Sequence, residues 1–241
     1  MRKIKNLLLL CLVACFVVSC SSKDVSKYPG TAEDAVKEII KSGIFYPESY
    51  EPMNFRVDSA FFDLEKVSEI YRLCENLDEL YGKEKSYESD YNNALSSKDI
   101  YSPSRRFNNS EHNQYEYEKY SKECEVFKDR LEEIRKKISS VVNEMRQLEK
   151  VIKLDEKIKD NHYGWIVWHR FKARPQDYPT SVIDERVFLF SKDLMLSYGS
   201  LGIEEFKDLI AFIKNIPDAT DYEEFKNIYN EYMTKDPFSM R

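Results

Sequence analysis

Residues 117–152 read YEKYSKECEVFKDRLEEIRKKISSVVNEMRQLEKVI, and this stretch decides the fold. Its apolar side chains recur at alternating steps of three and four residues, which is the heptad pattern of a coiled-coil seam. The seam consists of Tyr117, Tyr120, Cys124, Phe127, Leu131, Ile134, Ile138, Val141, Met145, Leu148 and Ile152. Neither proline nor glycine occurs from Glu111 to Lys159. A helix of this length cannot bury its apolar stripe without a partner.

The partner helix is expected upstream in the same chain. The same three-four spacing links Val67, Ile70, Cys74, Leu77 and Tyr81. Residues 96–110 contain Pro103 and several Ser and Asn residues, which favour a turn. The sequence therefore predicts a long antiparallel helical hairpin, a coiled coil, over residues 63–159.

Strands are predicted on both sides of the hairpin. Polar and apolar residues alternate over 53–62 and again over 163–174, where Tyr163 to Arg174 form a face that is apolar and a face that becomes basic. Further strands are expected at 184–190 and at 194–198, before Gly199 and Gly202 interrupt the pattern. The single strand before the hairpin cannot form a stable sheet by itself, so it is expected to join the strands after the hairpin.

Helices are also predicted on both sides of the hairpin. One is expected to begin after Thr31 and end near Gly43, another to follow Gly202 until Pro217, and a last one to start at Thr220. The predicted fold is α+β: a small antiparallel sheet packed with helices and interrupted by the hairpin. The α+β domain would comprise residues 31–62 and 160–241.

The amino terminus has the pattern of an export signal. Basic residues precede an apolar run from Leu7 to Val18 that is too short to cross a bilayer. The run ends in Val17-Val18-Ser19-Cys20, which fits the lipobox of bacterial lipoproteins. We therefore expect residues 1–19 to be removed, Cys20 to carry the lipid that holds the protein on a membrane, and residues 20–30 to form a tether.

The location that follows is the cell envelope. The residues after the lipidated cysteine are Ser21 and Ser22, with no aspartate of the kind that retains lipoproteins in the inner membrane, so the outer membrane is favoured by analogy. Removal of the signal takes the net charge from -6 to -9. Nucleic-acid modules need a clustered basic face, so this acidic chain is not expected to bind nucleic acid.

Two cysteines remain besides Cys20 after processing. Cys74 and Cys124 fall on the hairpin seam, and neither belongs to a C-x-x-C pattern, so no metal site and no cofactor are predicted. If the arms start level at Phe62 and Lys157, Cys74 lies opposite Met145, roughly 30 Å from Cys124. Buried thiols are the favoured interpretation, and a disulfide is the alternative.

Three motifs carry a resemblance to a known group of proteins. They are Tyr46-Pro47-Glu48-Ser49-Tyr50-Glu51-Pro52, Val57-Asp58-Ser59 and the run GWIVWHRFKA at 164–173. They resemble uncharacterised lipoproteins from Bacteroides-type bacteria, over the two flanks and not over the hairpin. The resemblance implies a helix packed on a curved antiparallel sheet, similar to small cystatin-like domains, often with a coiled-coil insert. It implies no activity.

Candidate chemistry is sparse, and no catalytic residues are predicted. His169 alternates onto the inward face of its strand, where a hydrogen-bonded structural histidine is favoured over a catalytic or ligand-binding one. Trp168, Arg170 and Lys172 share the other face and offer a surface for acidic or sugar ligands. The favoured alternative is that a neighbouring helix shields Trp168.

Two classes of function fit these observations. The first is a tethered binding or assembly protein whose hairpin offers its polar faces or its tip, with Arg105, Arg106 and Phe107, to an envelope protein. The second is an envelope enzyme or enzyme inhibitor that acts through the sheet face. We favour the first, because coiled coils extend and pair but rarely catalyse.

Overall fold

The computed structural model describes residues 32–104, 110–158, 161–216 and 222–233, and these form two structural units. The first unit contains the described residues up to Ser68, Val151–Asn215 and those from Tyr229 onwards. The second contains Glu69–Lys150 and Ile216–Ile228. The segment Ile216–Ile228, which the sequence interpretation assigned to the α+β domain, thus belongs to the unit that holds most of the hairpin.

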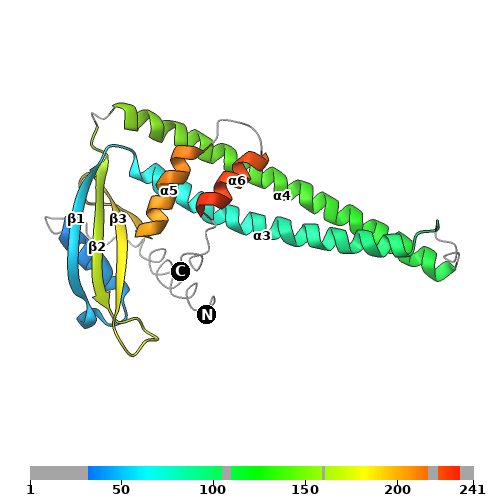
Figure 1. Cartoon of the computed structure of the whole chain (residues 1–241), viewed down its shortest axis with the longest axis horizontal. Helices are drawn as coiled ribbons and strands as arrows, with labels where there is room; N and C mark the ends of the chain where they lie inside the picture. Colours follow the sequence, from blue (N-terminus) through cyan, green and yellow to red (C-terminus); the bar gives the residue numbers. More distant parts are fainter. Residues whose placement is uncertain (1–31, 105–109, 159–160, 217–221, 234–241) are drawn as a thin grey trace. The chain divides into compact units, whose positions relative to one another are not determined.

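The first unit is built on a four-stranded antiparallel sheet with the strand order β1-β2-β3-β4 (Figure 1). The strands are β1 (Glu51–Ala60), β2 (Gly164–Ala173), β3 (Val182–Ser191) and β4 (Ser197–Gly202). The two strands that flank the hairpin in the sequence are direct neighbours, with Phe55 opposite His169. The predicted α+β class, with one sheet drawn from both flanks, is therefore confirmed.

Helix α2 (Ala32–Gly43) covers one face of the sheet. Its apolar residues Ala35, Val36 and Ile40 pack in one buried cluster with Phe171 and Phe188 of the strands. The spacing of these positions along α2 places them on one side of the helix, which is what an amphipathic helix on a sheet requires. This face is the apolar core of the first unit.

Helix α5 (Ile203–Asn215) packs on the opposite face. Its Phe206 meets the ring of Trp168 edge-on, with the ring centroids 5.5 Å apart. Phe206, Leu209 and Phe212 are all buried. Because helices contact both faces, residues on both sides of β2 are buried near its start, including Ile166 and Val167.

The position of the fourth strand was predicted wrongly. Strand β4 starts at Ser197 instead of Leu194, and it runs through Gly199 to Gly202. The carboxylate of Asp193 accepts hydrogen bonds from the Ser191 hydroxyl and from the Met195 N–H, which extends the turn. Leu194 takes a positive φ of 61° within this turn, so the chain re-enters the sheet three residues later than expected.

The hairpin consists of α3 (Leu64–Ile100) and α4 (Glu111–Ile158). Helix α3 extends past the predicted start of the turn at Ser96, where the side chain of Ser96 donates a hydrogen bond to the Asn92 carbonyl one turn earlier. Contacts between the arms fix their antiparallel register. Arg135 pairs with Glu84 at 2.9 Å, and the Tyr101 and Tyr120 rings stack with their centroids 5.8 Å apart.

Helix α6 (Tyr222–Met233) is divided between the two units. In the second unit, its Phe225 is fully buried and lies beneath the guanidinium of Arg146. Its Lys226 ammonium lies 3.2 Å from the Glu84 carboxylate. In the first unit, Tyr229 is buried edge-on against Phe212 of α5.

Candidate protein-binding surface

The distal hairpin is the part of the second unit formed by residues 87–100 of α3 and 111–127 of α4. Only two of its described residues are buried, Ala94 and Cys124, and both are small. In the rest of the second unit, large apolar residues such as Leu77, Ile138 and Met145 fill the seam. The heptad pattern continues into the distal hairpin, but the apolar side chains there are only partly covered.

Tyrosine is the main apolar side chain of the distal hairpin. Tyr115 is 63% exposed, and the other members are half-buried: Tyr87, Tyr91, Tyr117 and Tyr120. Tyr101, one residue past the end of α3, is also half-buried. The sequence interpretation assigned Tyr117 and Tyr120 to the apolar seam of the coiled coil. A tyrosine at a seam position can keep its hydroxyl in water while its ring covers the neighbouring arm. The heptad pattern does not distinguish such a half-buried tyrosine from a fully buried one.

Cations hold several of these rings in place. Lys98 lies over the Tyr117 ring at 5.5 Å, Lys119 over Tyr120 at 4.8 Å and Arg130 over Tyr87 at 5.8 Å. Such contacts orient the rings and leave part of each ring in solvent. The distal hairpin therefore presents amphipathic aromatic groups, three of which contact cations.

Exposed aliphatic residues accompany the tyrosines. Leu95 and Ile100 of α3 and Val126 of α4 are all exposed in the same segment. Protein interfaces are enriched in tyrosine and arginine and combine apolar cores with polar rims. The tyrosines and the exposed aliphatic residues of the distal hairpin match the aromatic and apolar part of that description.

The predicted residues at the tip lie outside the described residues. This applies to Arg105, Arg106 and Phe107, and also to the lipidation site Cys20. The distal hairpin borders the tip on both sides in the sequence. The distal hairpin carries tyrosines that the prediction of the tip surface left out. The high tyrosine content of residues 87–120 is the feature of the sequence that indicates them.

The predicted basic stripe on the sheet forms ion pairs with neighbouring strands. Arg170 pairs with Glu185 of β3 at 3.0 Å, and Lys172 pairs with Glu51 of β1 at 3.3 Å. An acidic ligand would have to displace these carboxylates. On this surface the cationic residues of β2 therefore belong to a ladder of cross-strand pairs.

Trp168 is held from three sides. Its indole N–H donates to the Asp58 carboxylate at 2.8 Å, the Arg56 guanidinium lies over its ring at 4.5 Å, and Phe206 of α5 packs on its edge. The ring is half-buried as a result. This arrangement agrees with the alternative in which a helix shields Trp168.

His169 has a structural environment. It is only 1% exposed, and its ring stacks on Phe55 with the centroids 3.8 Å apart. Its Nδ1 lies 2.8 Å from the Asn54 carbonyl oxygen, which can only accept, so Nδ1 carries the proton. Its Nε2 then accepts from the Tyr50 hydroxyl at 2.8 Å. Burial lowers the pKa of His169 and raises that of Tyr50 to about 12, so both side chains are neutral.

The two described thiols are buried and are not joined by a disulfide. The register set by Glu84 with Arg135 separates Cys74 from Cys124 by roughly 30 Å along the hairpin. The interpretation of buried thiols is therefore confirmed. Burial, followed by the nearby carboxylates of Asp78 and Glu75, raises the pKa of Cys74.

The described residues contain neither a metal-binding cluster nor a helix that could span a membrane. In this part of the chain, no three His, Cys, Asp or Glu side chains are grouped so that they could hold a metal ion. Nor does any helix there combine the length and apolar character that crossing a membrane requires. Comparison of the chain with protein-family models, curated proteins and solved structures finds no match.

Proposed function

We propose that this protein is a lipid-anchored component of the bacterial cell envelope and acts as a binding or assembly module. The anchor is lipid on Cys20, and the binding surface for an envelope protein is the distal hairpin. The partly exposed tyrosines of that segment carry the proposal, because aromatic side chains on a helix surface are typical of protein interfaces.

The amino-terminal sequence supports the anchor. Val17-Val18-Ser19-Cys20 follows a short apolar run with a basic start, which is the arrangement of a lipoprotein signal. The motif resemblance to Bacteroides-type lipoproteins points in the same direction. Ser21 and Ser22 favour the outer membrane over the inner membrane.

The anchor is tested by substitution of the acylated thiol. A Cys20→Ala chain is expected to lose incorporation of an alkyne-labelled fatty acid and to leave the membrane fraction. Cys11→Ala provides the matched control, because it removes a cysteine from the apolar run of the signal and keeps Cys20. Equal labelling and equal membrane recovery of the Cys20→Ala chain and its parent would contradict the anchor.

The binding surface is tested by photocrosslinking in intact cells. A photoreactive amino acid at Tyr115 of the distal hairpin is expected to capture one defined envelope protein. The same amino acid at Tyr178, an exposed tyrosine of the first unit, is the matched control. Loss of the adduct when Leu95→Ser is introduced would support the surface. The same set of adducts at both positions, or none at Tyr115, would argue against it.

A further inference from the structure

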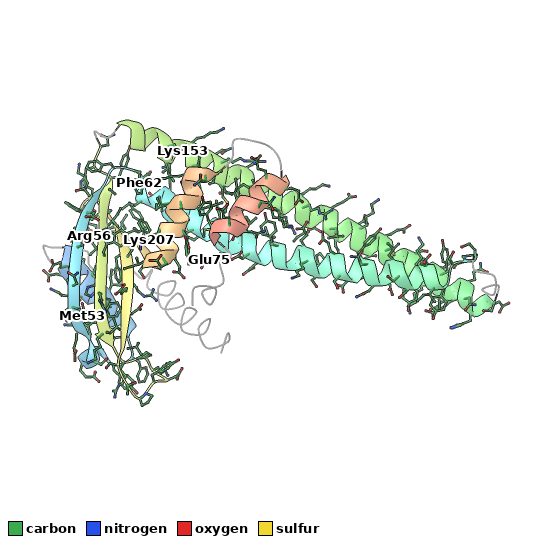
Figure 2. The ribbon with its side chains drawn as sticks, viewed as in Figure 1. Met53, Arg56, Phe62, Glu75, Lys153 and Lys207 are labelled. Atoms are coloured by element: carbon green, nitrogen blue, oxygen red, sulfur yellow. The ribbon has the colours of Figure 1, made fainter. Side chains whose placement is uncertain are left out.

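We propose that strand β1 is a self-association surface at which a second copy of this chain pairs antiparallel, with Val57 at the two-fold axis. The inference concerns the first unit and does not rest on the proposed function of the hairpin. β1 spans ten residues at the edge of the sheet, and β2 is its one neighbouring strand in the described sheet. Figure 2 shows Met53 and Arg56 on this outer strand. A long edge strand is a ready template for pairing with another strand.

The exposed apolar residues of β1 and the residue that follows it are symmetric about Val57. Met53 lies four residues before Val57 and Phe61 four residues after it, and all three are exposed. In an antiparallel pair centred on Val57, the two Val57 residues lie opposite each other. The register of β1 with β2 shifts between Pro52 and Asn54, at Met53, and Phe61 follows the last residue of β1, so both residues lie at the ends of the regular strand. The register centred on Val57 brings the Met53 end of each copy next to the Phe61 end of the other.

The charges next to Val57 have the same symmetry with opposite sign. Arg56 precedes Val57 and Asp58 follows it, so the register centred on Val57 places each Arg56 opposite Asp58 of the other copy. Registers centred one residue earlier or later would place Arg56 opposite Arg56 or Asp58 opposite Asp58. Like charges directly opposite each other destabilise a strand pair, whereas opposite charges stabilise it. A two-fold interface needs a self-complementary surface of this kind.

The charged side chains are already ordered within one copy. The Arg56 guanidinium donates to Asp58 from Nε at 3.0 Å and pairs with it through Nη2 at 2.9 Å. The Trp168 N–H holds the same carboxylate oxygen. In the paired state these two ion pairs would lie side by side and form an alternating cluster of four charges. Little side-chain freedom would be lost, because the groups are positioned beforehand.

Cysteine crosslinking of the full chain in its native membranes tests the register. Residues directly opposite each other in an antiparallel pair have Cα atoms about 4.5–5.5 Å apart, which a disulfide can join. Val57→Cys is therefore expected to give a disulfide-linked dimer on mild oxidation. Ser59→Cys is the register control, because its Cα would lie roughly 13 Å from that of the second copy at about 3.3 Å per residue.

A second control separates specific pairing from random collision. Val182 is 40% exposed and Val57 is 39% exposed, but Val182 lies on the inner strand β3. Val182→Cys is expected to give no dimer. Absence of the Val57→Cys dimer, or dimers of equal yield from all three variants, would overturn the proposal.

Charge exchange provides an independent measurement by sedimentation of the purified full chain. Arg56→Asp alone places acids opposite acids, and Asp58→Arg alone places bases opposite bases, so each variant is expected to be monomeric. An equimolar mixture of the two restores opposite charges at both positions and is expected to form heterodimers. Monomers throughout the mixture, with each variant showing the circular dichroism of the parent chain, would contradict pairing in this register.

Discussion

The hydroxyl of Tyr50 donates a hydrogen bond of 2.8 Å to Nε2 of His169, 119 residues later in the chain. This bond and the bond from Nδ1 to the Asn54 carbonyl satisfy both nitrogens of a buried ring. The pair joins the segment before β1 to the centre of β2. It therefore links the two parts of the sequence that flank the hairpin.

Tyr50→Phe is expected to lower the free energy of unfolding by about 1–3 kcal/mol, because it leaves Nε2 of His169 buried without its donor. Urea denaturation followed by circular dichroism measures the change. Tyr178→Phe removes an exposed hydroxyl and should change stability by less than about 0.5 kcal/mol. Equal effects of the two variants would show that the Tyr50–His169 bond does not contribute.

Acid is expected to destabilise the fold through His169. Burial lowers the pKa of His169 below its ordinary value of 6.5, so the unfolded chain binds a proton first as the pH falls. The contribution of His169 to stability is complete above pH 6.5 and is lost as the pH falls from there toward the lowered pKa. In His169→Gln, which does not titrate in this range, the urea midpoint should change less between pH 7.5 and 5.5 than in the parent. An unchanged pH dependence would contradict this assignment.

The Glu84 carboxylate is buried in the second unit and forms two ion pairs there. Its side chain is 3% exposed and pairs with Arg135 of α4 and Lys226 of α6. Glu84→Ala should lower stability by about 1–3 kcal/mol and raise the rate of proteolysis within α6, because both cations lose their common acceptor. Glu133→Ala, which removes an exposed partner of Lys137, is the control and should leave both readouts unchanged.

Cys74 and Cys124 are expected to resist a maleimide reagent in the folded protein at pH 8 and to react on denaturation, because both thiols are buried. Mass spectrometry of the labelled peptides reads each site separately from Cys20. Dithiothreitol should not alter the urea midpoint. Rapid labelling of Cys74 in the native protein would contradict its burial.

Two glycines should respond in opposite directions to alanine. A Cβ at Gly164 would collide with the backbone carbonyl of Phe190, so Gly164→Ala is expected to destabilise the protein by about 3 kcal/mol. Gly82 lies within α3 and has open space around it, so Gly82→Ala should stabilise the protein by about 1 kcal/mol. Thermal unfolding of the two variants measures both shifts, and shifts of the same sign would refute the comparison.

The sequence patterns predicted the helices and strands more accurately than they predicted which groups surround each side chain. Alternation along β2 predicted that His169 points inward and that Trp168 lies on the opposite face. It did not show that Glu185 and Glu51 would pair with Arg170 and Lys172, because those carboxylates come from other strands. The start of β4 was predicted three residues too early for a related reason. The side chain of Asp193 extends the turn through hydrogen bonds that no periodicity records.

The sequence by itself determined the two long helices, their antiparallel pairing and the separation of Cys74 from Cys124, because the period of apolar residues along a helix fixes which side is buried. It also determined that strands on both sides of the hairpin share one sheet. Only the tertiary structure decided which seam positions are covered, how His169 is protonated and that β1 is an edge strand. Those properties depend on groups brought together from distant positions, and a one-dimensional period carries no information about them.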